Sequence, residues 1–153
     1  MGAPNRTAKR LWATVLLVAA SCMSCVDLSG YYGIVPVQVS DEHTVYFKRV
    51  VRGLNFDEIS ISPAPILCGS PNDETDYEIT NSGPVAMLYK VDGGNLFVFI
   101  HNDVARPPNG GQFPVKVIQQ SLDTPEYSRL ESDAERLGLT PLHVEIDESL
   151  KCK

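Results

Sequence analysis

Residues 85–101 read VAMLYKVDGGNLFVFIH, and this stretch decides the class of fold. Two apolar runs, 85–91 and 96–101, flank the turn Asp92-Gly93-Gly94-Asn95. Glycine readily adopts the positive φ angles that tight turns require, so the stretch predicts a β-hairpin. The second run is apolar on both faces, which indicates a central strand covered from both sides.

Outward from the hairpin, alternating patterns predict further strands. A strand over 45–52 has apolar residues at alternate positions. A shorter one alternates Ile59 and Ile61 with Ser60 and Ser62, and we expect the two serines to face solvent. Other short strands are predicted at residues 34–39, 76–80, 115–119 and 142–146.

One helix is predicted after Asp123. This residue is a good N-cap, and Glu126 stands three positions later in a capping-box arrangement. Pro125 lies in the first turn, where its missing N–H is tolerated, and Gly138 supplies the C-terminal stop. One apolar stripe at helical spacing contains Tyr127, Leu130, Ala134 and Leu137.

The order of elements predicts an α+β fold, with a mostly antiparallel β-sheet of about six to seven strands and one amphipathic helix packed on it. Pro36 cannot donate a ladder hydrogen bond, so 34–39 is expected as an edge strand or an extended arm. The strands at 115–119 and 142–146, which flank the helix, could pair in parallel.

Composition narrows the class of protein. The chain has 153 residues, of which 43% are apolar and 21% charged, as expected for one folded domain. Acidic residues outnumber basic ones 19 to 13. This balance argues against a nucleic-acid partner and against attraction to anionic lipid.

The first residues have the pattern of a secretory signal. Arg6, Lys9 and Arg10 precede an uncharged apolar run from Leu11 to Ala20, and Ser21 adds a small residue. The run is about half of the ~20 residues that a membrane-spanning helix needs. We therefore predict a signal peptide over 1–21; the alternative is a buried N-terminal helix.

The end of this segment, Val18-Ala19-Ala20-Ser21-Cys22, resembles the lipobox of bacterial lipoproteins. The resemblance implies cleavage before Cys22 and lipid attachment to it. Residues 22–31 would then form a lipidated tether, and residues 32–153 a single globular domain. Ordinary cleavage after Ala20 or Ser21, with Cys22 left as a thiol, is the alternative.

Lipid attachment would supply the attraction to the membrane that the charge of the mature chain does not provide. Removal of residues 1–21 leaves 10 basic and 19 acidic residues, a formal charge of 10 − 19 = −9. Membrane residence then depends on acyl chains, at about 0.8 kcal/mol per buried methylene. The expected location is the cell envelope, with the domain facing the periplasm or the exterior.

The other cysteines are candidates for a disulfide, because exported proteins occupy oxidising compartments. The favoured pair is Cys68–Cys152, and the rival pairs join Cys25 to one of them. The Cys22/Cys25 spacing lies at the cleavage point, so we expect no zinc or redox site there.

No catalytic motif or cofactor fingerprint is present, and we predict neither a cofactor nor a metal. Two histidines are candidate acid–base groups. His143 shares a face of the predicted last strand with Glu145 and Asp147, a trio that could also hold a metal, although a solvated face is favoured. His101 ends the hairpin strand, followed by Asn102 and Asp103. His43 has no visible partner.

The leading hypothesis is a lipid-anchored binding module, such as an inhibitor, an immunity protein or an accessory protein, that meets a basic protein partner. The candidate contacts are the aromatic pair Tyr31 and Tyr32 and the acidic residues Asp73, Glu74 and Asp76. The alternatives are a small envelope hydrolase that uses His101 or His143 with nearby carboxylates, and a purely structural lipoprotein.

Overall fold

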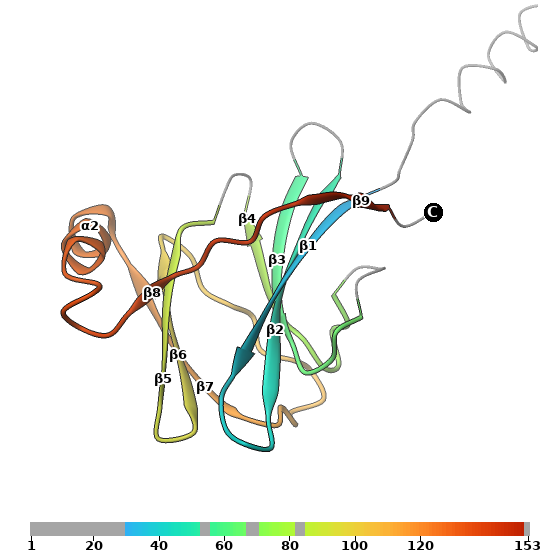
Figure 1. The fold of residues 1–153 in the computed structure, drawn as a ribbon, viewed down its shortest axis with the longest axis horizontal. Coiled ribbons are helices and arrows are strands. Elements are labelled where there is room, and N and C mark those ends of the chain that lie inside the picture. Colours follow the sequence, from blue (N-terminus) through green and yellow to red (C-terminus); the bar gives the residue numbers. More distant parts are fainter. Residues whose placement is uncertain (1–29, 53–55, 67–70, 82–84, 152–153) are drawn as a thin grey trace, which may run out of the picture.

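Two β-sheets pack face to face, and one helix lies outside the second sheet (Figure 1). The computed structural model describes residues 30–52, 56–66, 71–81 and 85–151. Sheet A is antiparallel in the order β4-β3-β2-β1-β9. Its strands are β1 (Tyr31–Gln38), β2 (Thr44–Arg52), β3 (Phe56–Ser62), β4 (Tyr77–Asn81) and β9 (Asp147–Lys151).

Sheet B has the order β7-β6-β5-β8, with β6 and β7 parallel and the other pairs antiparallel. Its strands are β5 (Met87–Asp92), β6 (Asn95–His101), β7 (Lys116–Leu122) and β8 (Thr140–Pro141). Within the described ranges, the mostly antiparallel β-structure with one helix is confirmed. The prediction of a single sheet of six to seven strands is wrong, because the strands divide between two sheets.

The hairpin forms as predicted between β5 and β6. Gly93 and Gly94 have φ angles of 55° and 73°, which a side chain would disfavour. β6 lies between β5 and β7, so it is a central strand. Its alternate residues Leu96, Val98 and Ile100 are fully buried against the inner face of sheet A.

The helix α2 (Thr124–Ser132) begins at the predicted capping box. The Asp123 carboxylate accepts the Glu126 N–H at 2.9 Å. The helix is shorter than predicted, since turns follow from residue 133 and Leu137 is 40% exposed. Gly138 ends these turns at φ 64°. The helix packs on the outer face of sheet B through buried residues Leu88, Leu122, Tyr127, Ala134 and Leu139.

The predicted strand over 142–146 is wrong, and so is its parallel pairing with 115–119. The segment crosses from β8 in sheet B to β9 in sheet A and has no ladder partner along the way. Its alternation survives as burial, because Val144 is buried while His143 and Glu145 are exposed. The segment runs close to β1, where a side chain at Gly33 would collide with the Glu145 carbonyl.

Pro36 is tolerated because β1 has few partners on one side. β1 pairs with β2 over its whole length, but with β9 only around Tyr31 and Tyr32. Pro36 therefore lies where no second ladder passes among the described strands. Tyr31, which we expected to end the tether, already belongs to β1.

The opposite side of the sandwich is closed by the connection between β6 and β7. Arg106 forms an isolated bridge with Glu78 of β4. The Gln119 side chain of β7 donates to the Ala105 carbonyl at 2.8 Å and accepts a hydrogen bond from the Ala105 N–H at 2.7 Å. This connection thus ties the edge strands of both sheets together. No helix in the described part of the chain is long and apolar enough to cross a membrane.

Candidate functional site

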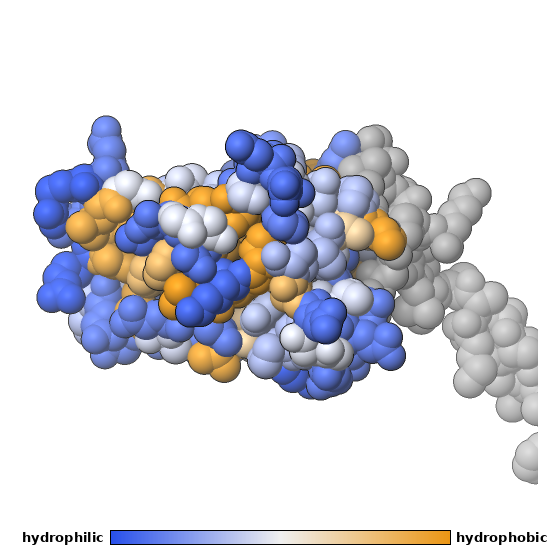
Figure 2. Space-filling model, turned by 90° about the horizontal axis from the view of Figure 1, so that it is seen from below, coloured by the Kyte–Doolittle hydropathy of each residue, from blue (hydrophilic) through white to orange (hydrophobic). Residues whose placement is uncertain are grey.

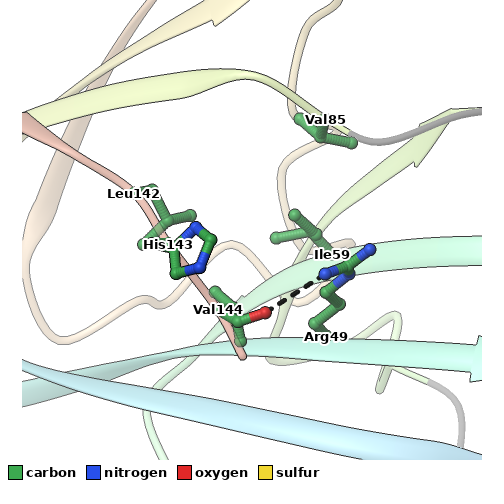
Figure 3. Close-up of a pocket in the computed structure, with 6 residues that line it drawn as sticks. All are labelled: Arg49, Ile59, Val85, Leu142, His143 and Val144. Atoms are coloured by element: carbon green, nitrogen blue, oxygen red, sulfur yellow. Dashed lines mark hydrogen bonds between the residues drawn. The ribbon is translucent and has the colours of Figure 1, made fainter. Parts of the chain in front are cut away.

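A pocket of about 170 Å³ lies between the two sheets, beside the crossing segment that follows β8 (Figure 3). β2 and β3 form one wall, and the crossing segment forms another. The residues that line it are Arg49, Ile59, Val85, Leu142, His143 and Val144. Most of these side chains are apolar, so Arg49 and His143 give the pocket its polar character.

Arg49 is held on the inner face of sheet A by two partners. Its Nε donates to both carboxylate oxygens of Asp57, at 2.9 and 3.2 Å, and its Nη2 donates at 2.6 Å. Its Nη1 donates to the Val144 carbonyl at 3.2 Å (Figure 3). The hydrogen bonds to Asp57 raise the pKa of Arg49 further, against the opposing effect of burial. The guanidinium is therefore a fixed cation that joins β2, β3 and the crossing segment.

His143 stands at the mouth of the pocket with its side chain 83% exposed. Its Nε2 lies 3.8 Å from a Glu145 carboxylate oxygen, and Glu145 is equally open to solvent. The predicted trio with Asp147 does not form on one strand, because Asp147 begins β9. Within the described ranges, no three His, Cys, Asp or Glu side chains come together as a metal site.

His101 meets different partners from those the sequence suggested. Its Nε2 lies 2.9 Å from both the Thr124 hydroxyl and the Asn102 amide. Its ring lies 5.2 Å from that of Tyr127, and burial raises the pKa of Tyr127 to about 12. Asp103 instead accepts the Val104 N–H. The cluster joins the end of β6 to the start of α2.

His43 also has a partner that the sequence did not reveal, since its Nδ1 lies 3.2 Å from the Ser40 hydroxyl. Both residues belong to the connection between β1 and β2. The pair therefore contributes to a local turn, whose backbone is closed by a Val39 N–H to His43 carbonyl bond of 2.9 Å.

The acidic segment before β4 divides into exposed and buried residues. Asp73 and Glu74 are exposed, whereas Asp76 is 97% buried, with 3% of its surface accessible. Lys48 of β2 donates to Asp76 at 3.0 Å. Asp76 also accepts the Asn72 N–H at 3.2 Å and the Thr75 hydroxyl at 3.0 Å. Asp76 is thus an anchor of this loop rather than part of its exposed surface.

The exposed half of the loop is fixed by its backbone. The Asp73 carbonyl accepts the Asn109 N–H at 2.7 Å, and the Glu74 N–H donates to the Asn72 side chain at 3.0 Å. Gly110 lies so close to the Glu74 carbonyl that an added Cβ would stand 2.7 Å from it. We call residues 71–76 the acidic loop.

The acidic loop returns against the outer face of sheet A, where a polar layer is buried. Its members are Lys48, Glu58, Ser60, Ser62 and Asp76. The expectation that Ser60 and Ser62 face solvent is therefore wrong. Strand alternation identifies a polar face, but not whether another segment will cover it.

Glu58 stands out in this polar layer because its carboxylate has no hydrogen bond to any described residue. Burial raises its pKa, Arg52 opposes the rise, and the negative charge of Asp73 adds to it. Its nearest cross-strand neighbours are Val50 and Thr80.

The two predicted interface tyrosines are separated by the alternation of β1. Tyr31 is 36% exposed and Tyr32 only 5%. Tyr31 is therefore accessible, while Tyr32 packs inside the protein. Cys22, Cys25, Cys68 and Cys152 all lie outside the described residues, as does the predicted signal segment.

Figure 2 views the end of the sandwich that carries the turn between β5 and β6. At this end, polar residues surround a band of apolar surface. Val91, beside the hairpin turn, belongs to the exposed apolar residues. The polar groups around the band keep it narrow in this view.

The geometry defines a two-sheet β-protein with a helix on one outer face, a small pocket between the sheets and a fixed acidic loop. No protein-family model, curated protein or solved structure matches the chain.

Proposed function

We propose that the chain is an exported, lipid-anchored binding module of the cell envelope, which presents its acidic loop to a basic protein. In this proposal residues 1–21 direct export, Cys22 carries the acyl chains, and the segment before β1 is the tether. The sandwich then acts as a scaffold for the loop.

The exposure of Asp73 and Glu74 on a fixed backbone is the observation that carries the proposal. Two carboxylates that point to solvent would accelerate the encounter with a cationic surface. Because the loop is held by Asn109 and by the buried Asp76, little conformational entropy is lost when a partner binds. Fixed exposed charge of this kind favours recognition.

Charge reversal tests the assignment to this loop. The full-length chain is used to capture proteins from envelope extract at low salt, beside Asp73→Lys/Glu74→Lys and the matched control Asp41→Lys/Glu42→Lys. Both pairs are exposed, and both changes add the same charge. We expect the first variant to lose the partner and the control to retain it. Equal loss in both, or no partner for the native chain, would contradict the proposal.

A separate experiment tests the anchor. Cys22→Ser should move the protein from the membrane pellet to the soluble fraction, because the acyl chains lose their attachment point. Cys25→Ser is the control and should stay in the pellet. If Cys22→Ser sediments like the native chain, the anchor is refuted while the binding assignment still stands.

A small hydrolase is the second candidate function, favoured by the position of His143 at the pocket mouth beside Glu145. His143 would act there as the general base. Turnover of p-nitrophenyl acetate should be lost in His143→Ala. Loss in His101→Ala instead would place the chemistry at the end of β6, and no turnover above background would rule out esterase activity.

A further inference from the structure

The pocket between the sheets has features of a ligand site that are independent of the acidic loop. Its walls are the aliphatic side chains of Ile59, Val85, Leu142 and Val144. In Figure 3 the Arg49 guanidinium and the His143 imidazole lie on opposite sides of the space, with Val85 above it. An occupant would thus meet apolar walls and one fixed hydrogen-bond donor.

Arg49 has donor capacity that the protein does not use. A guanidinium carries five N–H groups. The bonds from Nε and Nη2 to Asp57 and from Nη1 to Val144 use three of them. One N–H on each terminal nitrogen has no acceptor among the described residues. The Arg49 side chain is 28% exposed, so these two N–H groups are accessible to an acceptor on a ligand.

The surrounding charges determine which acceptor fits. The Arg49 charge is already matched by Asp57 at 2.6 Å, and Glu145 adds a negative charge near the mouth. A carboxylate or phosphate would meet both acids, whereas an uncharged carbonyl would take the free N–H groups without this repulsion. The pocket therefore discriminates by charge as well as by shape.

The volume limits the size of the ligand. About 170 Å³ is close to the roughly 150 Å³ of an engineered cavity that binds benzene, a ligand of about six non-hydrogen atoms. A branched aliphatic group with one carbonyl, about six non-hydrogen atoms in all, matches this space.

We propose that this pocket binds a small, uncharged amide group on a branched aliphatic chain, with the amide oxygen accepting from Arg49. The aliphatic part packs against Val85, Leu142 and Val144. The amide belongs to a small molecule, and the site does not depend on the acidic loop or on the lipid anchor.

The test compares two probes of equal size on the full-length chain, isobutyramide and isobutyrate. NMR titration at neutral pH follows the methyl groups of Val85, Leu142 and Val144. We expect saturable shifts with isobutyramide and at least about tenfold weaker binding of isobutyrate. Equal or tighter binding of isobutyrate would overturn the proposal, and so would the absence of saturable shifts up to the solubility limit of the amide.

Two matched variants locate the binding. Val85→Phe fills the pocket and should weaken isobutyramide binding at least about tenfold. Val91→Phe makes the same change on exposed β5 surface outside the pocket and should leave the affinity within about twofold. Equal affinities for both variants would place the probe elsewhere and refute the site.

Discussion

The two faces of sheet A use the same strands but different chemistry. The inner face carries the apolar residues Val45, Phe47, Ile59, Ile61 and Ile79, which pack against sheet B. The outer face carries the polar layer around the Lys48–Asp76 pair, covered in part by the acidic loop. Both faces are buried, so polarity along a strand does not by itself tell which face meets water.

The difference lies in how each face is stabilised. The inner face gains free energy from removing apolar surface from water, and each residue contributes through its volume. The outer face depends on partners, because a buried polar group is costly once it loses its hydrogen bond. The following substitutions should therefore have different signatures on the two faces.

The largest effect is expected from Ile61→Ala on the inner face. Ile61 is fully buried, and its truncation should lower the free energy of unfolding by about 4 kcal/mol, from lost burial and a residual cavity. Chemical denaturation measures the loss, and Ile61→Val should cost only about 1 kcal/mol. Equal costs for both variants would show that volume does not control this face.

The next effect is expected from Asp76→Ala on the outer face. The variant leaves the Lys48 ammonium buried without its acceptor, and we expect a loss of about 3 kcal/mol. Asp73→Ala removes an exposed charge and should change stability by less than about 0.5 kcal/mol. A similarly small effect of Asp76→Ala would mean that the pair does not stabilise the loop.

Glu58→Gln should have the opposite sign. Since burial raises the folded-state pKa of Glu58 above the usual 4.5, ionisation of this group destabilises the folded protein. The penalty is absent below pH 4.5 and fully present above the folded pKa. The variant should thus be more stable by about 0.5–2 kcal/mol at neutral pH.

The pH dependence of thermal stability is the control for Glu58→Gln. Thermal unfolding of the native chain and Glu58→Gln should converge as the pH falls toward 4.5. A stability gap that is constant with pH would assign the effect to packing rather than to charge.

The smallest effects distinguish the two serines of the polar layer. Ser62 accepts the Ala64 N–H at 3.3 Å, so Ser62→Ala should cost about 1 kcal/mol. The Ser60 hydroxyl makes no hydrogen bond to a described residue, and Ser60→Ala should be close to neutral. Denaturation midpoints of the two variants compare them directly, and the reverse order would show that partners do not determine the stability of this face.

Local patterns predicted the hairpin and the capping box because turn geometry and capping depend on neighbouring residues. The site depends on contacts over long separations. Arg49 and Val144 are 95 residues apart, and Lys48 and Asp76 are 28 apart. A single sequence shows no signal for such pairs. The sequence also carries no signal that residues 142–146 are not a strand. Their alternation reflects burial of this crossing segment between the two sheets, although it is paired in neither.

The most direct test of the central claim, that the buried polar layer holds the acidic loop ready for a basic partner, uses Lys48→Met/Asp76→Leu. This variant replaces the ion pair with apolar residues and keeps Asp73 and Glu74, so it should remain folded. In capture from envelope extract at equal loading, we predict that it recovers clearly less partner than the native chain. Equal recovery would contradict the claim, because the exposed acids would then bind without the layer beneath them.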